Sequence, residues 1–466
     1  MRYISTRGLA PALDFGDVLL TGLASDGGLY VPETWPSFSL EGFVREHGAD
    51  ASYATLATAI MWPYVDGSID HDTFAEIVEA AYATFEHPDV APLRDLGEGI
   101  HVLELFHGPT LAFKDVALQL VGRLFDHELA KRQERVTIVA ATSGDTGSAA
   151  IEAVRDRDAI EIFVLHPHER TSPLQRRQMT TVDAANVHNL AVEGTFDDCQ
   201  DLVKAMFADE AFRSRVNLSA VNSINWARVM AQIVYYWWAA LQLGRVGKPM
   251  SFAVPTGNFG NVFAGFCARR MGLDIAQFVV GSNRNDILTR FFDTGEMTIT
   301  EVEPSLSPSM DIQVSSNLER LLFELHARDG EAVANFMTAF RESGTARIDP
   351  YKLGALRESW DGARVDDAET LEVIRQTAND TGHVLDPHTA VGLGAARKTG
   401  RLGEIPMVVL ATAHPAKFPA AIVEATGSEP ETPPRLARVA ELPERFDVIA
   451  AEPGAVQGYI LGRTQA

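Results

Sequence analysis

A short apolar run, a glycine-containing loop and a helical pattern follow one another in Val136-Thr-Ile-Val-Ala-Ala-Thr-Ser-Gly-Asp-Thr-Gly-Ser148. The same order recurs in Phe252-Ala-Val-Pro-Thr-Gly-Asn-Phe-Gly-Asn261. In both segments the apolar run predicts a buried strand, and the loop leads into the N-terminus of a helix. Backbone N–H groups at such a point can bind a phosphate or a carboxylate. The first loop taken alone is equally consistent with a tight turn that binds nothing.

Further apolar runs extend this pattern along the chain. Strand-like runs at Ile160–Leu165, Phe278–Gly281 and Met407–Ala411 alternate with helical patterns such as Thr146–Val154 and Asn261–Met271. Alternation of strands and helices predicts an α/β fold with mainly parallel sheets. Ligands of such sheets bind at the loops that leave the carboxyl ends of the strands. Both glycine-containing loops are at such positions.

The chain of 466 residues is too long for one ordinary core. Its first part has helical patterns between Tyr53 and Phe85, followed by the turn-rich stretch His87-Pro-Asp-Val-Ala-Pro92. We therefore expect a mainly helical N-terminal domain at residues 1–95. A middle domain at 96–235 would hold the first glycine loop, and a larger α/β domain at 236–466 would hold the second.

Composition excludes several classes of protein. The formal net charge of −23 disfavours nucleic acid and anionic membranes as partners. We see no apolar run long enough to span a membrane and no secretory signal. The two cysteines, Cys199 and Cys267, predict neither a disulfide framework nor a zinc finger. We expect a cytoplasmic enzyme.

Lys114 is one of only seven lysines in the chain. It lies in Phe106-His-Gly-Pro-Thr-Leu-Ala-Phe-Lys-Asp115, where Gly-Pro predicts a turn and Thr110 is a candidate cap for the helix that follows. A lysine about one turn into a helix lies near the positive end of the helix dipole. Such a lysine suggests an anionic or covalent partner nearby. The alternative is a solvated lysine paired with Asp115.

Other nucleotide and metal motifs do not fit. The glycine spacing of the first loop is not that of a dinucleotide fingerprint, and Gly247-Lys248 lacks the rest of a phosphate-binding loop. His166 and His168 follow a predicted strand, where two histidines more often face solvent than bind a metal. We expect no metal site.

Seven segments, in order along nearly the whole chain, together resemble the threonine synthases, and in particular the longer-chain branch of that family. Each segment alone is moderately specific, whereas the ordered set is highly specific. The segments are Ser25-Asp-Gly-Gly-Leu-Tyr-Val-Pro32, His107-Gly-Pro-Thr-Leu-Ala-Phe-Lys-Asp115, Thr142-Ser-Gly-Asp-Thr-Gly147, Asn222-Ser-Ile-Asn-Trp-Ala-Arg228, Gly257-Asn-Phe-Gly-Asn261, Asp311-Ile-Gln-Val-Ser-Ser-Asn-Leu-Glu-Arg320 and Ala411-Thr-Ala-His-Pro-Ala-Lys-Phe418.

The resemblance implies a tryptophan synthase β-like fold (fold-type II) with pyridoxal 5′-phosphate as cofactor. It implies a lyase that makes L-threonine and phosphate from O-phospho-L-homoserine and water, as a monomer or homodimer. Lys114 would hold the cofactor as a Schiff base, with Phe113 beside it, and Thr412 would hydrogen-bond to the pyridine nitrogen. The cofactor phosphate would be bound by Gly257, Asn258, Phe259, Gly260 and Asn261.

The resemblance also assigns the first glycine loop, whose residues would lie beside the pyridine O3′ and the substrate carboxylate. The substrate phosphate would be bound by Asn225 and Arg228. Asp145 replaces the asparagine of the shorter enzymes and cannot donate a hydrogen bond unless protonated, so its contact stays open. The loop residues are Thr142, Ser143, Gly144, Asp145 and Thr146.

Two alternatives stay open. A phospholyase or dehydratase on the same fold would share the early steps and release 2-oxobutyrate. A catalytically silent relative would keep the fold for binding partners alone, but such a protein is expected to lose the lysine or the phosphate loop. Both features are present here.

Overall fold

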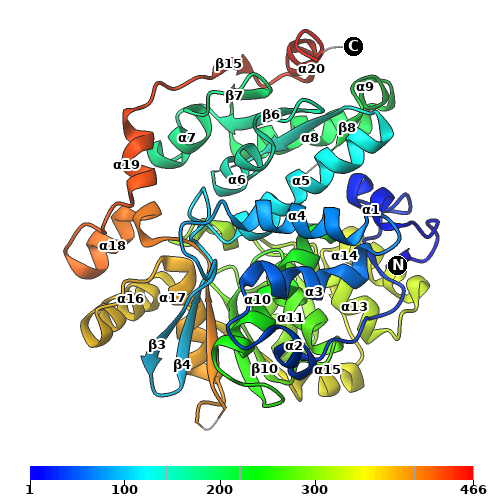
Figure 1. Ribbon diagram of the computed structural model, residues 1–466. Helices are drawn as coiled ribbons and strands as arrows, with labels where there is room; N and C mark the ends of the chain where they lie inside the picture. Colours follow the sequence, from blue (N-terminus) through cyan, green and yellow to red (C-terminus); the bar gives the residue numbers. More distant parts are fainter. Residues whose placement is uncertain (143, 220–221, 404, 465–466) are drawn as a thin grey trace.

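Two bodies, each built on a mainly parallel sheet, make up the computed structural model, which describes residues 1–142, 144–219, 222–403 and 405–464 (Figure 1). Ser143 is outside these ranges. No helix in the described part of the chain is long and apolar enough to cross a membrane.

The larger body contains a six-stranded sheet with the order β13-β10-β9-β14-β4-β3. Neighbouring strands are parallel except for the antiparallel pair β3–β4. Every residue of β9 and β14 is buried, as expected for central parallel strands covered on both faces. The strands are β3 (Leu93–Gly97), β4 (Ile100–Glu104), β9 (Met250–Pro255), β10 (Ile275–Ser282), β13 (Trp360–Arg364) and β14 (Met407–Ala411).

The smaller body contains a five-stranded parallel sheet with the order β15-β7-β6-β5-β8. Its last strand comes from the C-terminal end of the chain, which runs along one side of the molecule from the larger body (Figure 1). The strands are β5 (Val136–Ala141), β6 (Ile160–Pro167), β7 (Val187–Glu193), β8 (Leu218–Ser219) and β15 (Asp447–Ala450).

Helix α10 (Trp226–Gln242) is the most buried helix of the larger body. Every residue from Trp226 to Leu241 is buried, because the helix packs against α3, α5 and α11. Asn225 caps its start by accepting a hydrogen bond from the Ala227 N–H at 2.9 Å. The apolar run from Met230 to Leu241 therefore lies in a buried helix.

The N-terminal unit is mainly helical and packs on the larger body. Tyr3 of its first strand packs against Trp226 of α10 with the rings tilted and 5.8 Å between their centroids. Its elements are β1 (Tyr3–Ser5), α1 (Phe15–Thr21), β2 (Tyr30–Pro32), α2 (Leu40–His47), α3 (Tyr53–Val65) and α4 (His71–Tyr82).

The remaining elements cover the sheets or connect them. Those of the smaller body and its connections are α5 (Lys114–Arg132), α6 (Asp145–Val154), α7 (Pro173–Thr180), α8 (Phe196–Ala208), α9 (Glu210–Val216), α19 (Pro434–Glu441) and α20 (Pro453–Leu461). Those of the larger body are α11 (Gly260–Arg270), α12 (Ile287–Thr294), β11 (Glu296–Thr298), η1 (Pro308–Met310), α13 (Leu318–Leu325), α14 (Gly330–Ser343), β12 (Thr345–Arg347), α15 (Pro350–Arg357), α16 (Asp367–Thr381), α17 (Pro387–Thr399), η2 (Pro415–Lys417) and α18 (Pro419–Thr426).

The α/β class with mainly parallel sheets is confirmed, and each strand expected from the sequence is present, with its ends within three residues of those expected. The sheets do not follow the expected boundary at 235, because β4 pairs with β14 and β15 pairs with β7. The division into residues 1–95, 96–235 and 236–466 stays a prediction.

Candidate active site

The segment that leads into Lys114 lies beside the end of β14, next to Thr412. The segment before the lysine pairs with the segment after β14: the Phe113 N–H donates to the Thr412 carbonyl at 2.8 Å, and the His414 N–H donates to the Leu111 carbonyl at 3.0 Å. Helix α5 begins at Lys114 itself, and Phe113 is its N-cap without a capping side chain. The expected cap, Thr110, has a different role.

Thr110 holds the buried carboxylate of Asp115 instead. Its N–H and hydroxyl donate to the two carboxylate oxygens at 2.7 and 2.8 Å. Burial raises the pKa of Asp115 to about 6, against the opposing effect of these two bonds. Because Asp115 pairs with Thr110, the interpretation of Lys114 as a solvated lysine paired with Asp115 is wrong.

The Lys114 amine is almost completely enclosed. Its side chain is 11% exposed, and the carboxylate oxygen Oδ2 of Asp145 is 4.0 Å from Nζ. Burial lowers the pKa of Lys114 to about 8; the charges of Lys417 and Arg228 add to this effect and that of Asp145 opposes it. A lysine whose pKa lies near neutral pH can be present as the free amine, so it suits a proton-transfer role.

The first glycine loop connects β5 to α6, which begins at Asp145 without a capping side chain. Within this loop, Thr142 Oγ1 accepts the N–H groups of Gly144 and Gly147, each at 3.0 Å. Those two N–H groups are therefore satisfied inside the loop. Thr146 is partly buried at the start of α6.

The second glycine loop connects β9 to α11. Phe259 has a left-handed backbone (φ 65°) and precedes Gly260, the first residue of α11, without a capping side chain. Its ring stacks on Trp360 at 5.8 Å, so only its backbone is free to face a ligand. The buried Asn261 Nδ2 has no hydrogen-bond partner among the described residues, whereas Asn258 is exposed.

The segment from Ser309 to Asn317 supports this loop from behind. Ser315 Oγ donates to the Gly257 carbonyl at 2.6 Å, and Asn317 Nδ2 donates to the Asn258 carbonyl at 2.9 Å. A Cβ atom on Gly257 would lie 2.7 Å from the Ser309 carbonyl oxygen, so this position requires glycine.

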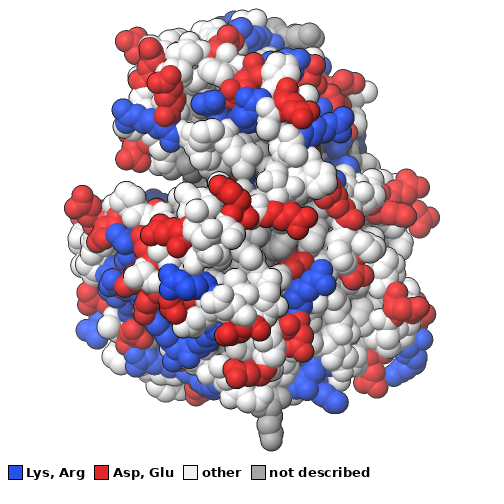
Figure 2. Space-filling model, turned by 90° about the vertical axis from the view of Figure 1, so that its left-hand side faces the viewer, with Lys and Arg blue, Asp and Glu red and all other residues white. Residues whose placement is uncertain are grey.

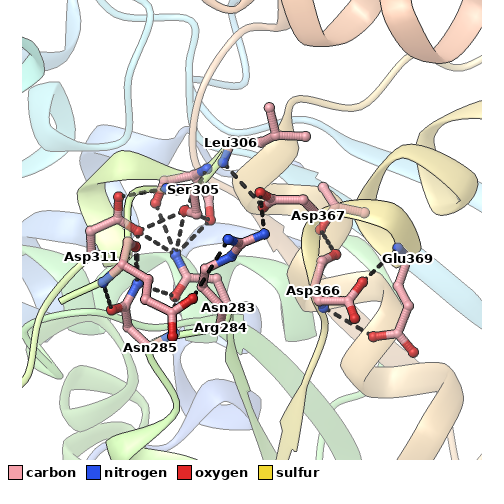
Figure 3. Close-up of polar contacts among 12 residues, drawn as sticks. Asn283, Arg284, Asn285, Ser305, Leu306, Asp311, Asp366, Asp367 and Glu369 are labelled. Carbon is pink, nitrogen blue, oxygen red and sulfur yellow. Dashed lines mark hydrogen bonds and ion pairs between the residues drawn. The ribbon is translucent and has the colours of Figure 1, made fainter. Parts of the chain in front are cut away.

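Asp311 anchors the supporting segment to the end of β10 (Figure 3). Its Oδ1 accepts hydrogen bonds from the amides of Asn283 at 2.7 Å and Asn285 at 3.1 Å, and from the Ser305 hydroxyl at 2.6 Å. The network connects the loop after β10 to the segment behind the second glycine loop. It explains why the Asp311–Arg320 motif is present although none of its residues was expected in the site.

Thr412 is buried at the end of β14. Its N–H donates to the hydroxyl of Thr389 at 3.2 Å, and Thr389 in turn donates to Asp386. Asp386 also accepts the N–H of His388 at 3.0 Å, as the N-cap of α17. The backbone of Thr412 is therefore held by α17.

Arg228 and Asn225 differ in whether the protein satisfies the hydrogen-bonding groups of their side chains. Arg228 is buried, and its Nε and Nη1 have no hydrogen-bond partner among the described residues. The Asn225 amide instead donates to the Leu19 carbonyl at 2.7 Å, and its oxygen caps α10. The side chain of Asn225 is thus engaged in holding α10, and its role in binding the substrate phosphate stays a prediction.

Comparison with known proteins agrees with this geometry. Residues 2–82 match the family "Threonine synthase N terminus", residues 88–339 match "Pyridoxal-phosphate dependent enzyme", and residues 389–460 match "Threonine synthase, C-terminal". A threonine synthase from Pseudomonas aeruginosa is 55% identical over 461 residues, covering 99% of this chain and 98% of that protein.

The chain belongs to the threonine synthase family. A crystal structure of threonine synthase from Brucella melitensis with bound PLP (pyridoxal 5′-phosphate) has a TM-score of 0.97 and 50% identity, and covers all of both chains. The yeast threonine synthase structure has a TM-score of 0.93 and 37% identity, covering 99% of this chain and 98% of that one. The expected family, fold-type II architecture, enzyme class and cofactor are confirmed.

The residues of the site fit PLP. The start of α11 offers N–H groups without a capping side chain, together with Asn261 Nδ2, which has no partner in the described part of the chain; this arrangement suits a phosphate. Lys114 provides the amine, and the backbone around Thr412 is fixed beside it. These two sets of groups follow neighbouring parallel strands, β9 and β14.

Two side chains of the site were not expected from the sequence. Lys417 Nζ lies 2.7 Å from Asp145 Oδ1, and Gln175 Nε2 donates to the same oxygen at 3.1 Å. Lys417 is in the segment Ala411–Phe418, of which only Thr412 was expected in the site. Because the chain has so few lysines, the sequence could have indicated Lys417, whereas nothing in the sequence indicates Gln175.

Proposed function

We propose that the chain converts O-phospho-L-homoserine and water into L-threonine and phosphate. The observation that supports this most directly is an enclosed lysine, Lys114, within electrostatic range of the buried guanidinium of Arg228, whose Nε and Nη1 have no hydrogen-bond partner among the described residues. A guanidinium without a protein acceptor suits a phosphate, since it can form charge-assisted and bidentate hydrogen bonds. The lysine supplies an amine that can be neutral near physiological pH.

Lys114 Nζ is the base that we assign to the proton on the substrate α carbon. Bound PLP supplies the electron sink for the pair left at that carbon, which no side chain can provide. A general base must lie within about 3 Å of its proton, and Lys114 follows directly after Phe113, whose N–H donates to the Thr412 carbonyl. The ammonium formed on Lys114 then faces the carboxylate of Asp145.

Arg228 is the group that we assign to the leaving phosphate. The phosphate leaves from the γ carbon after a second proton is lost from the β carbon; the γ carbon is then reprotonated, and water adds at the β carbon. Burial lowers the pKa of Arg228 to about 10, which still leaves it charged at neutral pH. Its cation would stabilise the negative charge that develops on the departing oxygen.

The other binding roles stay proposals. We assign contacts with the pyridine ring of the cofactor to Phe113 and Thr412. We assign binding of the substrate carboxylate to the loop that starts α6, and binding of the cofactor phosphate to the loop that starts α11. Ser143 belongs to the first loop but lies outside the described residues. The loops comprise Thr142, Ser143, Gly144, Asp145 and Thr146, and Gly257, Asn258, Phe259, Gly260 and Asn261.

Incubation with O-phospho-L-homoserine tests the function. The wild type should release threonine and phosphate in equal amounts, and Lys114→Ala should lose at least about a thousandfold in kcat because it lacks the base. Lys248→Ala, which removes an exposed lysine, is the matched control and should keep full activity. Equal threonine release by wild type and Lys114→Ala would overturn the mechanism, and 2-oxobutyrate as the main product would favour the dehydratase alternative.

We also propose a cytoplasmic location and a small-molecule substrate, with neither nucleic acid nor membrane as partner, and a monomer or homodimer. Cys199 and Cys267 are buried free thiols, which supports a reducing compartment. Acidic and basic side chains are interspersed over the face shown in Figure 2, which agrees with a protein that binds no polyanion there.

A further inference from the structure

Lys417 is a fully buried lysine whose amine contacts two segments of the site. Its side chain has no exposed surface, and Nζ lies 2.7 Å from Asp145 Oδ1 and donates to the Thr110 carbonyl at 2.8 Å. Burying an ammonium costs several kcal/mol unless it is paired and hydrogen-bonded. Both partners of Lys417 belong to segments that contain or face Lys114, so its placement serves the site rather than the core.

Asp145 divides its two oxygens between two lysines. Oδ1 accepts from Lys417 and from Gln175 Nε2, whereas Oδ2 faces Lys114 Nζ at 4.0 Å. A separation of 4.0 Å is too long for a hydrogen bond. The carboxylate therefore influences Lys114 by its charge without binding the amine.

The charges around the two lysines agree with this division. Burial alone would raise the pKa of Asp145, but the charges of Lys417, Lys114 and His388 hold it well below its ordinary value, so Asp145 is an anion at neutral pH. The charged groups that face Lys114 are Asp145, Lys417, Arg228 and Asp115.

We propose that Lys417 is a positioning residue for Lys114, which holds Asp145 by Oδ1 and so prevents a tight ion pair between Asp145 and Lys114. In such a pair the ammonium form of Lys114 would be favoured, and the amine could not accept the substrate proton. With Asp145 held away, Lys114 Nζ can take that proton, and the ammonium that forms is stabilised by Oδ2. This proposal rests on the function of Lys114 as the base proposed above.

Labelling of Lys114 in the full-length, cofactor-free chain tests the proposal independently of turnover. Only the neutral amine reacts with an acylating reagent such as acetic anhydride, so the pH midpoint of Lys114 labelling, followed by mass spectrometry, reports its protonation. The wild-type midpoint should lie near pH 8. In Lys417→Met, Asp145 is released toward Lys114 and a neighbouring cation is lost, so the midpoint should rise by about one unit or more, a tenfold change in the neutral fraction.

The matched control is Lys398→Met, which removes a half-exposed lysine paired with Glu369 at 2.6 Å. Its Lys114 midpoint should equal that of the wild type. A Lys417→Met midpoint that also equals the wild type would overturn the proposal. In the loaded enzyme, we expect kcat of Lys417→Met to fall about tenfold or more at pH 7 and to recover toward wild type as the pH rises, with KM changed by less than about threefold.

Asp145→Asn tests the same arrangement if Lys417→Met does not fold. Removing the carboxylate takes away the anion that favours protonated Lys114, so the midpoint should fall below the wild-type value; an unchanged midpoint would overturn the proposal. Failure of the wild type to make threonine would refute the proposed function, while the labelling result would still decide the role of Lys417.

Discussion

At the residue scale, the site depends on cations that are buried and only partly neutralised. Lys114 and Lys417 lie beside the carboxylate of Asp145, and Arg228 is close enough to Lys114 for its charge to lower the pKa of that lysine. Like charges placed together without water cost stability in the absence of an anionic ligand. This is the arrangement expected where an anionic cofactor and substrate bind, and its cost should be measurable in the cofactor-free protein.

Replacing Lys114 by Met should stabilise the cofactor-free chain at neutral pH by about 2–3 kcal/mol, because the folded state disfavours protonated Lys114. The pKa of Lys114 is about 8 in the folded chain against an ordinary value of 10.5. Between pH 8 and pH 10.5 the folded state binds fewer protons than the unfolded state. Wild-type stability should therefore rise with pH over this range, and the stability advantage of the variant should disappear. Urea unfolding at pH 7 and at pH 10 measures this, with Lys398→Met as control. An advantage that does not change with pH would contradict the assignment.

At the element scale, the helices that begin at Lys114 and Asp145, α5 and α6, pack closely against each other. Gly122 of α5 faces α6, and a Cβ atom there would lie 2.1 Å from the Ala153 carbonyl oxygen. Only glycine permits this approach of the two backbones. The helices could not keep their present separation with any larger residue at this position.

Gly122→Ala should therefore lower the free energy of unfolding by about 1–3 kcal/mol, because overpacking exceeds the helix-propensity gain of about 1 kcal/mol. Gly354→Ala is the matched control: Gly354 is inside helix α15, and its Cβ atom would meet nothing within 4 Å. This control should be neutral or slightly stabilising. Thermal unfolding of both variants decides the comparison, and equal midpoints would show that α5 and α6 can separate freely. We also expect Gly122→Ala to lower kcat, since it displaces Lys114 from Asp145.

At the scale of the whole molecule, the C-terminal segment returns from the larger body to complete the smaller one (Figure 1). Glu444 accepts two hydrogen bonds from Arg176 of α7, at 2.8 and 3.0 Å, and one from the Thr180 hydroxyl at 2.9 Å. Helix α7 also provides Gln175 to Asp145. The end of the chain thus supports a helix that reaches the active site.

Glu444→Gln should weaken this attachment by about 1–3 kcal/mol, because it replaces a bidentate charge-assisted pair with a weaker amide contact. The pKa of Glu444 is lowered chiefly by its hydrogen bond to Arg176, so its contribution should be present above pH 4.5 and be lost as the pH falls. Hydrogen exchange of β7 and β15 should increase in the variant. Glu441→Gln, in the same segment and exposed, is the control and should leave exchange unchanged.

Local patterns in the sequence predicted the α/β class and the strands β5, β6, β9, β10 and β14, because a strand covered on both faces needs an apolar run wherever it occurs. The ordered motifs predicted the family, the cofactor and Lys114. These features depend on residues close together in the chain, so spacing alone is sufficient to recognise them. The start of α5 was placed wrongly, because Thr110 binds Asp115 instead of capping the helix.

Contacts between distant segments were decided only by the packing of the two bodies. Lys417 reaches Thr110 across 307 positions of sequence, and Asn225 is engaged by Leu19 across 206. The electrostatics of Lys114 likewise depend on Asp145, which no local pattern pairs with Lys417. A hydrogen bond or ion pair of this kind forms only after the sheets have packed, so tertiary structure, and not local spacing, determines which buried side chain has a partner and which is left for a ligand.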